Sequence, residues 1–256
     1  MGESLAVARL TLLELSRRQL AWVTVFFAVV LAVIPQLIGA FGMTGFERVS
    51  KDACLTLLGW FAIGIALLLA ATAVPGDVER RTVYPLLARP MSRDQYLVGK
   101  FLGLAAWIAG SVMLCGAAIA LGCGAISHAL EARLLVGAAL EALKACVLAA
   151  VTLLFATRTG PVAAGIAALA VYIIAGLSDA YVGFFLEGEG VLSLAAWLVR
   201  AVKTVLPDFE VFHLKNALVH DEPLRFGYLA ALAAYGLAWI SGCLLAAGLV
   251  FGRHDL

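Results

Sequence analysis

The sequence has little charge for its length. Only 14% of its 256 residues are charged, whereas 63% are hydrophobic. Soluble domains are about one-quarter charged and about half apolar. A soluble fold of this length could not bury so much apolar surface. The composition therefore excludes an ordinary soluble domain and predicts an integral membrane protein.

The sequence also lacks the motifs of a metal or nucleotide site. Its cysteines form no C-x-x-C pair, lie in or beside apolar runs and are expected to pack between helices; they are Cys54, Cys115, Cys123, Cys146 and Cys243. The one Gly-Lys pair, Gly99-Lys100, precedes Phe101 and has no upstream glycine of a phosphate-binding loop. We expect no metal, no cofactor and no ATP site on this chain.

A cleavable signal peptide is not predicted. The first eighteen residues have no uninterrupted apolar core, because charges occur throughout them, at Glu3, Arg9, Glu14, Arg17 and Arg18. We expect the first span to act as an uncleaved anchor.

Long apolar runs define the fold class. A helix needs about 20 apolar residues to cross the hydrocarbon core. Six segments meet this need, over about 19–41, 53–74, 97–122, 134–156, 160–178 and 226–251. Helices satisfy the backbone within each segment in lipid, so we predict an all-α polytopic protein with six transmembrane helices.

Basic residues predict the orientation of these spans. Short cytoplasmic flanks carry an excess of Lys and Arg. If the N-terminus is cytoplasmic, the inside segments hold Arg9, Arg17, Arg18, Arg80, Arg81, Arg89, Arg93, Lys100, Arg158 and Arg253. The short outside loops then hold Arg48, Lys51 and Arg133. We therefore predict that both termini are cytoplasmic.

Two stretches are expected to lie on the membrane. Residues 1–18 predict an interfacial helix with an apolar stripe of Leu5, Ala8, Leu12 and Leu15. Residues 179–225 form the predicted outer-face loop. Within it, residues 190–206 predict an amphipathic helix, with polar and basic side chains on one face and Leu and Val on the other.

The charged stretch 75–96 separates the second and third spans. Pro75-Gly76 predicts the end of the incoming helix, and Asp77 can cap a new short helix. Pro90 predicts a break, after which Ser92 and Gln95 form an S-x-x-Q capping box for the helix that enters the third span. Taken alone, these charges favour an ordinary basic loop that fixes topology over a functional elbow, because such loops are common in multi-span proteins.

One sequence motif favours the functional interpretation. The stretch ERRTVYPLLARPMSRDQYLVGKFLG resembles a pattern of the type-2 ABC transporter permease family, and it matches at Glu79, Thr82, Leu86, Leu87, Arg89, Pro90, Ser92, Arg93, Tyr96, Gly99 and Lys100. Weaker similarities are the six spans, the Arg158 turn, LPDFEVFHL before the last span, and the charged tail. The chain departs from the pattern at Arg81, where the family has glycine, and at Pro85.

The resemblance implies a single permease domain over 1–256 that works with other chains. In this family a cytoplasmic coupling helix after the second span docks on an ATPase subunit. The resemblance implies that role here for Glu79, Arg81, Thr82, Arg89, Pro90, Ser92 and Arg93. It also implies a type-2 exporter, a second permease copy as homodimer or related heterodimer, and ATP with magnesium on the partner ATPase.

The same resemblance places the chain in a cell membrane. We expect a multi-pass protein of the bacterial inner membrane, in contact with lipids and with no nucleic-acid partner. It does not identify the transported substrate.

Charged and polar residues outside the elbow leave alternatives open. Glu141 and Lys144 lie within the fourth span, where charge is expensive, and are either a structural ion pair or part of a translocation path. His213, His220 and Asp221 in the outer loop are more typical of solvated residues than of a metal or acid–base site. The Gly- and Ala-rich fourth and fifth spans suit packing within the chain or a dimer seam.

Two other classes of function compete with the permease. An integral-membrane lipid-modifying enzyme would need a catalytic cluster, and a membrane assembly factor would have no transport activity. Association with an ATPase distinguishes both from a transporter.

Overall fold

The protein is described by a computed structural model. The structure describes residues 2–17, 19–40, 46–76, 93–127, 131–186, 206–212 and 226–252. Within these ranges all regular elements are helical. They are α1 (Gly2–Arg17), α2 (Leu20–Ala40), α3 (Phe46–Ala73), α6 (Arg93–Ser127), α7 (Ala132–Ala156), α8 (Pro161–Leu186), the 3-10 turn η1 (Glu210–Phe212) and α11 (Phe226–Gly252).

The predicted spans correspond to six of these helices. Five of them are long and apolar enough to cross a membrane, namely α2, α3, α6, α7 and α11. The sixth, α8, is apolar over Pro161–Gly176, a shorter stretch. The all-helical multi-span fold predicted from the apolar runs is confirmed.

Several helices extend beyond the apolar runs that predict them. α3 begins at Phe46 rather than near residue 53, and α6 covers Arg93–Ser127 rather than 97–122. α8 continues to Leu186, into the stretch assigned to the outer-face loop. Backbone hydrogen bonds do not stop where hydropathy falls. A helix can therefore continue through polar and charged residues beyond the apolar run.

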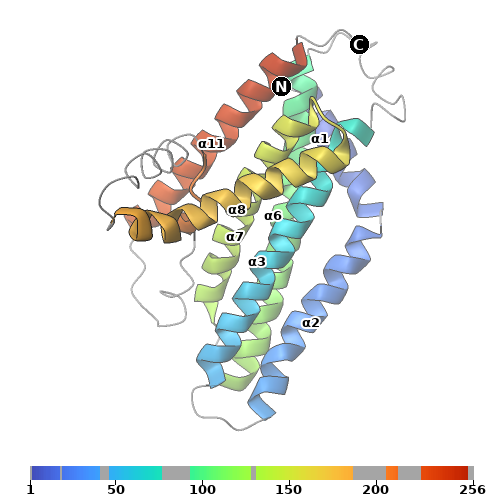
Figure 1. Cartoon of the computed structure of the whole chain (residues 1–256). Coiled ribbons are helices and arrows are strands. Elements are labelled where there is room, and N and C mark those ends of the chain that lie inside the picture. Colours follow the sequence, from blue (N-terminus) through green and yellow to red (C-terminus); the bar gives the residue numbers. More distant parts are fainter. Residues whose placement is uncertain are drawn as a thin grey trace.

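α7 is the central helix of the bundle. It contacts α3, α6, α8 and α11, and its side chains are buried on all sides over most of its length. A helix that is buried all round is hydrophobic all round, as α7 is apart from its charged pair. Figure 1 shows α2, α3, α6 and α7 side by side, with α8 crossing α3 and α7 at a steep angle.

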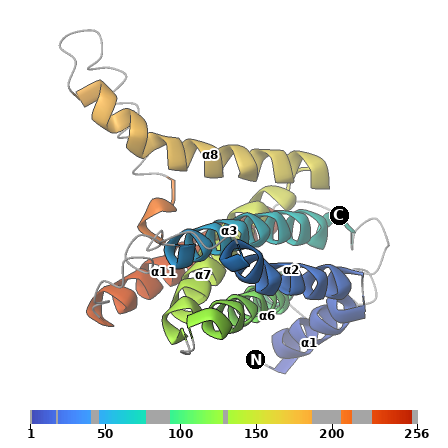
Figure 2. The ribbon, with the colours of Figure 1, turned by 90° about the horizontal axis from the view of Figure 1, so that it is seen from below.

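The outer helices show apolar faces to their surroundings. α2 exposes large side chains at helical spacing, namely Trp22, Phe26, Val29, Val33 and Leu37. In a membrane such a face contacts lipid rather than water. Figure 2 shows α8 on one side of the bundle and α1 on the opposite side.

Small residues of α8 pack within the chain. Ala164 and Ala168 are fully buried, and Ala164 forms a cluster with Ala71 of α3 and Ala156 of α7. Small side chains allow helices to approach closely. The Ala-rich face of this helix is therefore used, at least in part, for packing within one chain.

Charged and polar contacts show which helix ends lie together. Lys51, near the start of α3, lies 2.6 Å from Glu131, just before α7. At the same end the Gln36 side chain of α2 donates a hydrogen bond to the Gly122 carbonyl of α6. The ends of α2 and α6 and the starts of α3 and α7 therefore meet at one end of the bundle, as alternating spans require.

The buried face of α1 differs in part from the predicted stripe. Leu15 is buried, whereas Leu5 is 69% exposed. The other buried side chains in the described part of α1 are Val7 and Thr11, which lie against Gly99 and Gly103 of α6. Contact with α6 selects this buried face, and the stripe of an interfacial helix stays a prediction, because side chains that contact lipid are exposed in the chain itself.

Candidate functional site at the start of α6

Most of the predicted coupling elbow lies outside the described residues. This applies to Glu79, Arg81, Thr82, Arg89, Pro90 and Ser92. Arg93 is the first residue of α6, and its side chain is not described. What the structure describes is the frame of the elbow, meaning the end of α3 and the first turns of α6.

The elbow frame begins and ends where the sequence predicts. α3 ends at Ala73, next to Pro75-Gly76, and α6 begins at Arg93, directly after the predicted capping residue. Proline removes a donor from the helical ladder, which explains the stop. The two ends of the frame are therefore set by local sequence signals.

Both sides of the frame belong to one packed core. Leu69 of α3 and Val74, the residue after α3, are buried in the same apolar cluster as Leu97 and Phe101 of α6. Buried side chains interlock at crystal-like density, so a packed helix end transmits displacement with little compliance. The two ends of the frame are thus held in the same apolar core.

α1 is seated on α6 through two glycines. A Cβ added at Gly99 would lie 2.6 Å from the carbonyl oxygen of Ser4, and one added at Gly103 would lie 2.7 Å from that of Ala8. Real Cβ atoms do not come so close to backbone oxygen. The G-x-x-x-G spacing places both glycines on one helix face, where they admit a neighbouring backbone. We call Gly99 and Gly103 the glycine seat.

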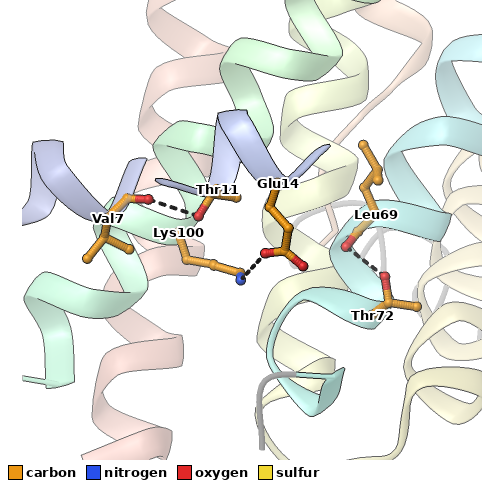
Figure 3. A network of polar contacts seen from close by, with 6 residues as sticks. All are labelled: Val7, Thr11, Glu14, Leu69, Thr72 and Lys100. Carbon is orange, nitrogen blue, oxygen red and sulfur yellow. Dashed lines mark hydrogen bonds and ion pairs between the residues drawn. The ribbon is translucent and has the colours of Figure 1, made fainter. Parts of the chain in front are cut away.

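Lys100, between the two glycines, reaches back to α1. Its Nζ lies 4.0 Å from Glu14 Oε2, and the side chains are 8% and 35% exposed, respectively. Figure 3 shows Lys100 extending towards Glu14, with Thr72 of α3 nearby. Thr11 donates a hydrogen bond to the Val7 carbonyl in its own helix, so its hydroxyl is satisfied although the side chain is buried.

The sequence alone does not show that Gly99 and Gly103 contact α1. Gly99 and Lys100 are part of the motif that carries the family resemblance, and their contact with α1 is what the structure adds. The signal in the sequence was the spacing of Gly99 and Gly103, typical of helix contacts in membranes.

The charged pair inside the fourth span forms a compact contact. Lys144 Nζ lies 2.5 Å from Glu141 Oε2, and their side chains are 1% and 11% exposed. Gly59 of α3 gives the carboxylate room, because a Cβ there would lie 3.4 Å from the same oxygen. Among the described residues neither of the two atoms has a partner with hydrogen-bond geometry, so the contact is chiefly electrostatic.

The predicted outer-face loop is described only over 206–212. Phe209 and Phe212 are buried in a cluster with residues of α7, α8 and α11. The Asp208 N–H donates to the Tyr235 hydroxyl at 2.8 Å, and the Asp208 carboxylate caps η1 by accepting from the Glu210 N–H. This short segment is thus held against α7, α8 and α11. His213, His220, Asp221 and the amphipathic stretch 190–205 lie outside the described residues.

The part of the chain that the structure describes contains no group of three or more His, Cys, Asp or Glu residues suited to a metal. The described polar contacts therefore include the frame with its glycine seat, the buried pair on α7, the segment before α11, and the Lys51–Glu131 pair at the helix ends.

The helices and their burial define a multi-pass helical membrane protein. A family model described as "ABC-2 family transporter protein" matches residues 5–256. The chain belongs to the ABC-2 transporter family, and the resemblance seen in the elbow motif is confirmed.

Two curated relatives carry the name "Probable ABC transporter permease protein NosY". The protein from Pseudomonas aeruginosa is 40% identical over 101 residues, which are 39% of this chain and 37% of the relative. The protein from Stutzerimonas stutzeri is 36% identical over 119 residues, 45% of this chain and 41% of the relative. The matched stretch spans less than half of either relative.

Proposed function

We propose that this chain is the membrane-spanning permease subunit of an ABC transporter. The observation that carries the proposal is the family match over residues 5–256. The names of the two relatives support it. The 256 residues contain no phosphate-binding loop, so the proposal assigns ATP and magnesium to separate ATPase subunits.

In this proposal the ATPase subunit docks on the elbow over 75–96. The contacting residues are Glu79, Arg81, Thr82, Arg89 and Arg93, and Pro90 and Ser92 shape the break between two short helices. The packed frame supports this role, because Val74 before the elbow and Leu97 after it lie in one core cluster. Rigid-body movement of helices is an established way to carry a signal into a membrane protein.

Two finer features belong to the same proposal. The transporter is an exporter, and a second permease copy completes it as a homodimer or related heterodimer. Family resemblance supports both. Chemical crosslinking of the purified complex, followed by mass determination, tests the dimer.

Reversal of three elbow charges tests the docking. Exposed ion pairs contribute about 0–1 kcal/mol each, so a single reversal would only weaken association. The test variant therefore combines Glu79→Lys, Arg89→Glu and Arg93→Glu. We expect normal membrane insertion and loss of the co-purifying ATPase. Arg158→Glu, an exposed reversal in the turn between α7 and α8, is the control and should retain the ATPase.

If as much ATPase co-purifies with the triple variant as with the unmodified chain, the elbow charges serve only to fix topology. If no ATPase co-purifies with the unmodified chain, the permease proposal itself is wrong.

The proposed orientation has both termini in the cytoplasm of a bacterial cell, with the chain in its inner membrane. Single cysteines at Arg89 and Met43 test it with a reagent that does not cross membranes. We expect labelling of residue 43 and not of residue 89 from outside intact cells, and the reverse pattern would overturn the orientation.

A further inference from the structure

The glycine seat joins α1 to α6 close to the point where α6 follows the elbow. Gly99 and Gly103 lie about two to three turns from Arg93, where the chain returns from the elbow. α1 packs mainly on α6, with a smaller contact to α2. A displacement that enters α6 at its first residue therefore meets α1 before it reaches the middle of the bundle.

The seat resists sliding for a steric reason. The carbonyl oxygens of Ser4 and Ala8 lie directly over the glycine backbone, where any Cβ would collide. Such close backbone contact adds van der Waals and weak C–H···O attraction along the helix pair. Ser4 and Ala8 are one turn apart on α1, as the glycines are on α6, so the two contacts share one register.

Charge adds a second constraint. Lys100 is nearly buried, and a buried cation needs a partner. Glu14 lies beyond the glycine contacts, so the pair resists rotation of α1 about the seat. Figure 3 shows the Lys100 side chain directed at the Glu14 carboxylate of α1.

We propose that Glu14 and Lys100, together with the glycine seat, hold α1 to the first turns of α6 so that the two helices move as one body during ATPase coupling. This rests on the proposed function. Glu14 and Lys100 are positioning residues: they set where α1 stands when the elbow moves and do not touch nucleotide or substrate.

A charge-swap cycle tests the proposal in the complete complex with the co-purifying ATPase. The variants are Glu14→Lys, Lys100→Glu and the two combined, and Arg9→Glu is the matched control because Arg9 is exposed on α1. For a partly exposed pair we expect each single reversal to lower ATP hydrolysis about fivefold. The amount of co-purified ATPase should stay within about twofold of that in the unmodified complex. The double swap should restore ATP hydrolysis, and Arg9→Glu should hydrolyse ATP at the unmodified rate.

A distance measurement separates positioning from a general loss of folding. Spin labels at Leu10→Cys and Leu102→Cys, both on exposed sites, report the separation of α1 and α6 by electron–electron resonance. The five native cysteines are buried, and labelling of the chain without added cysteines measures their background. We expect one narrow distance with and without ATP plus vanadate, and a broader distribution in each single reversal.

Three results would overturn the proposal: single reversals that hydrolyse ATP like the Arg9→Glu control, an unchanged distance distribution, or a distance that shifts with nucleotide in the unmodified complex. If reversals do not accumulate in the membrane, Glu14→Gln takes their place with an expected loss of about twofold. The distance measurement on the permease alone still reports the seat if no ATPase co-purifies, so failure of the proposed function is distinguishable.

Discussion

Two of the oppositely charged pairs in the described part of the chain differ in what they join. Glu141 and Lys144 lie on one helix, α7, and are buried within the bundle. Glu14 and Lys100 lie on two helices, and Glu14 remains in partial contact with the surroundings. The first pair neutralises charge within a rigid element, whereas the second links elements that can move. The buried pair is thus expected to matter for stability, and the peripheral pair for coupling.

The largest expected effect comes from breaking the buried pair. Glu141→Gln leaves the Lys144 ammonium without its counter-charge, and removal of one partner from a buried pair costs about 3–5 kcal/mol. We expect a strongly lowered midpoint of thermal unfolding in detergent. The combined variant Glu141→Leu and Lys144→Met removes both charges and should recover most of the loss.

Equal stability of Glu141→Gln and the unmodified chain would show that Lys144 finds another partner. The assignment of the pair as structural would then give way to the translocation-path alternative, because the charge would be reachable by water.

An intermediate effect is expected from filling the glycine seat. Gly103→Ala places a methyl group against the Ala8 carbonyl and the Thr11 side chain, and overpacking of this kind costs about 1–3 kcal/mol. Gly110→Ala on the same helix is the matched control, because a Cβ there meets nothing within 4 Å. Stability in detergent should fall for position 103 only. Equal behaviour of both variants would mean that α1 shifts freely on α6.

The smallest effect is expected from Thr11→Val. The Thr11 hydroxyl bonds only the Val7 carbonyl of its own helix, whereas its Cβ and methyl group form the contact with Gly103. Valine keeps that shape, so stability should change by less than about 0.5 kcal/mol in the same unfolding measurement. A larger loss would assign the hydroxyl a role in the seat that the contacts do not indicate.

The sequence predicts the spans and helix stops well because these depend on local chemistry. Pro75-Gly76 marks the end of α3, and the start of α6 at Arg93 follows the S-x-x-Q signal. Hydropathy misses the charged ends of helices, as with α3 beginning at Phe46. It measures affinity for lipid, whereas a helix persists wherever its hydrogen bonds do.

The site is less predictable because it depends on which helices meet. The spacing of Glu141 and Lys144 allows an intrahelical contact, and the structure has one. The partner of Lys100 could not be read in this way, since Glu14 is far away in sequence. An apolar stripe likewise cannot show that Val7 rather than Leu5 meets a glycine face on another helix.

The placement of Glu141 and Lys144 within α7 also bears on biosynthesis. α7 is synthesised before α8 and α11, two of the helices that later surround it. A lone charge in an apolar helix is costly to insert into lipid. Since the two charges are three residues apart, the span after Arg133 carries its own counter-ion, and residues 134–156 have no net charge when they enter the bilayer. Its membrane insertion therefore does not have to wait for the rest of the chain to leave the ribosome.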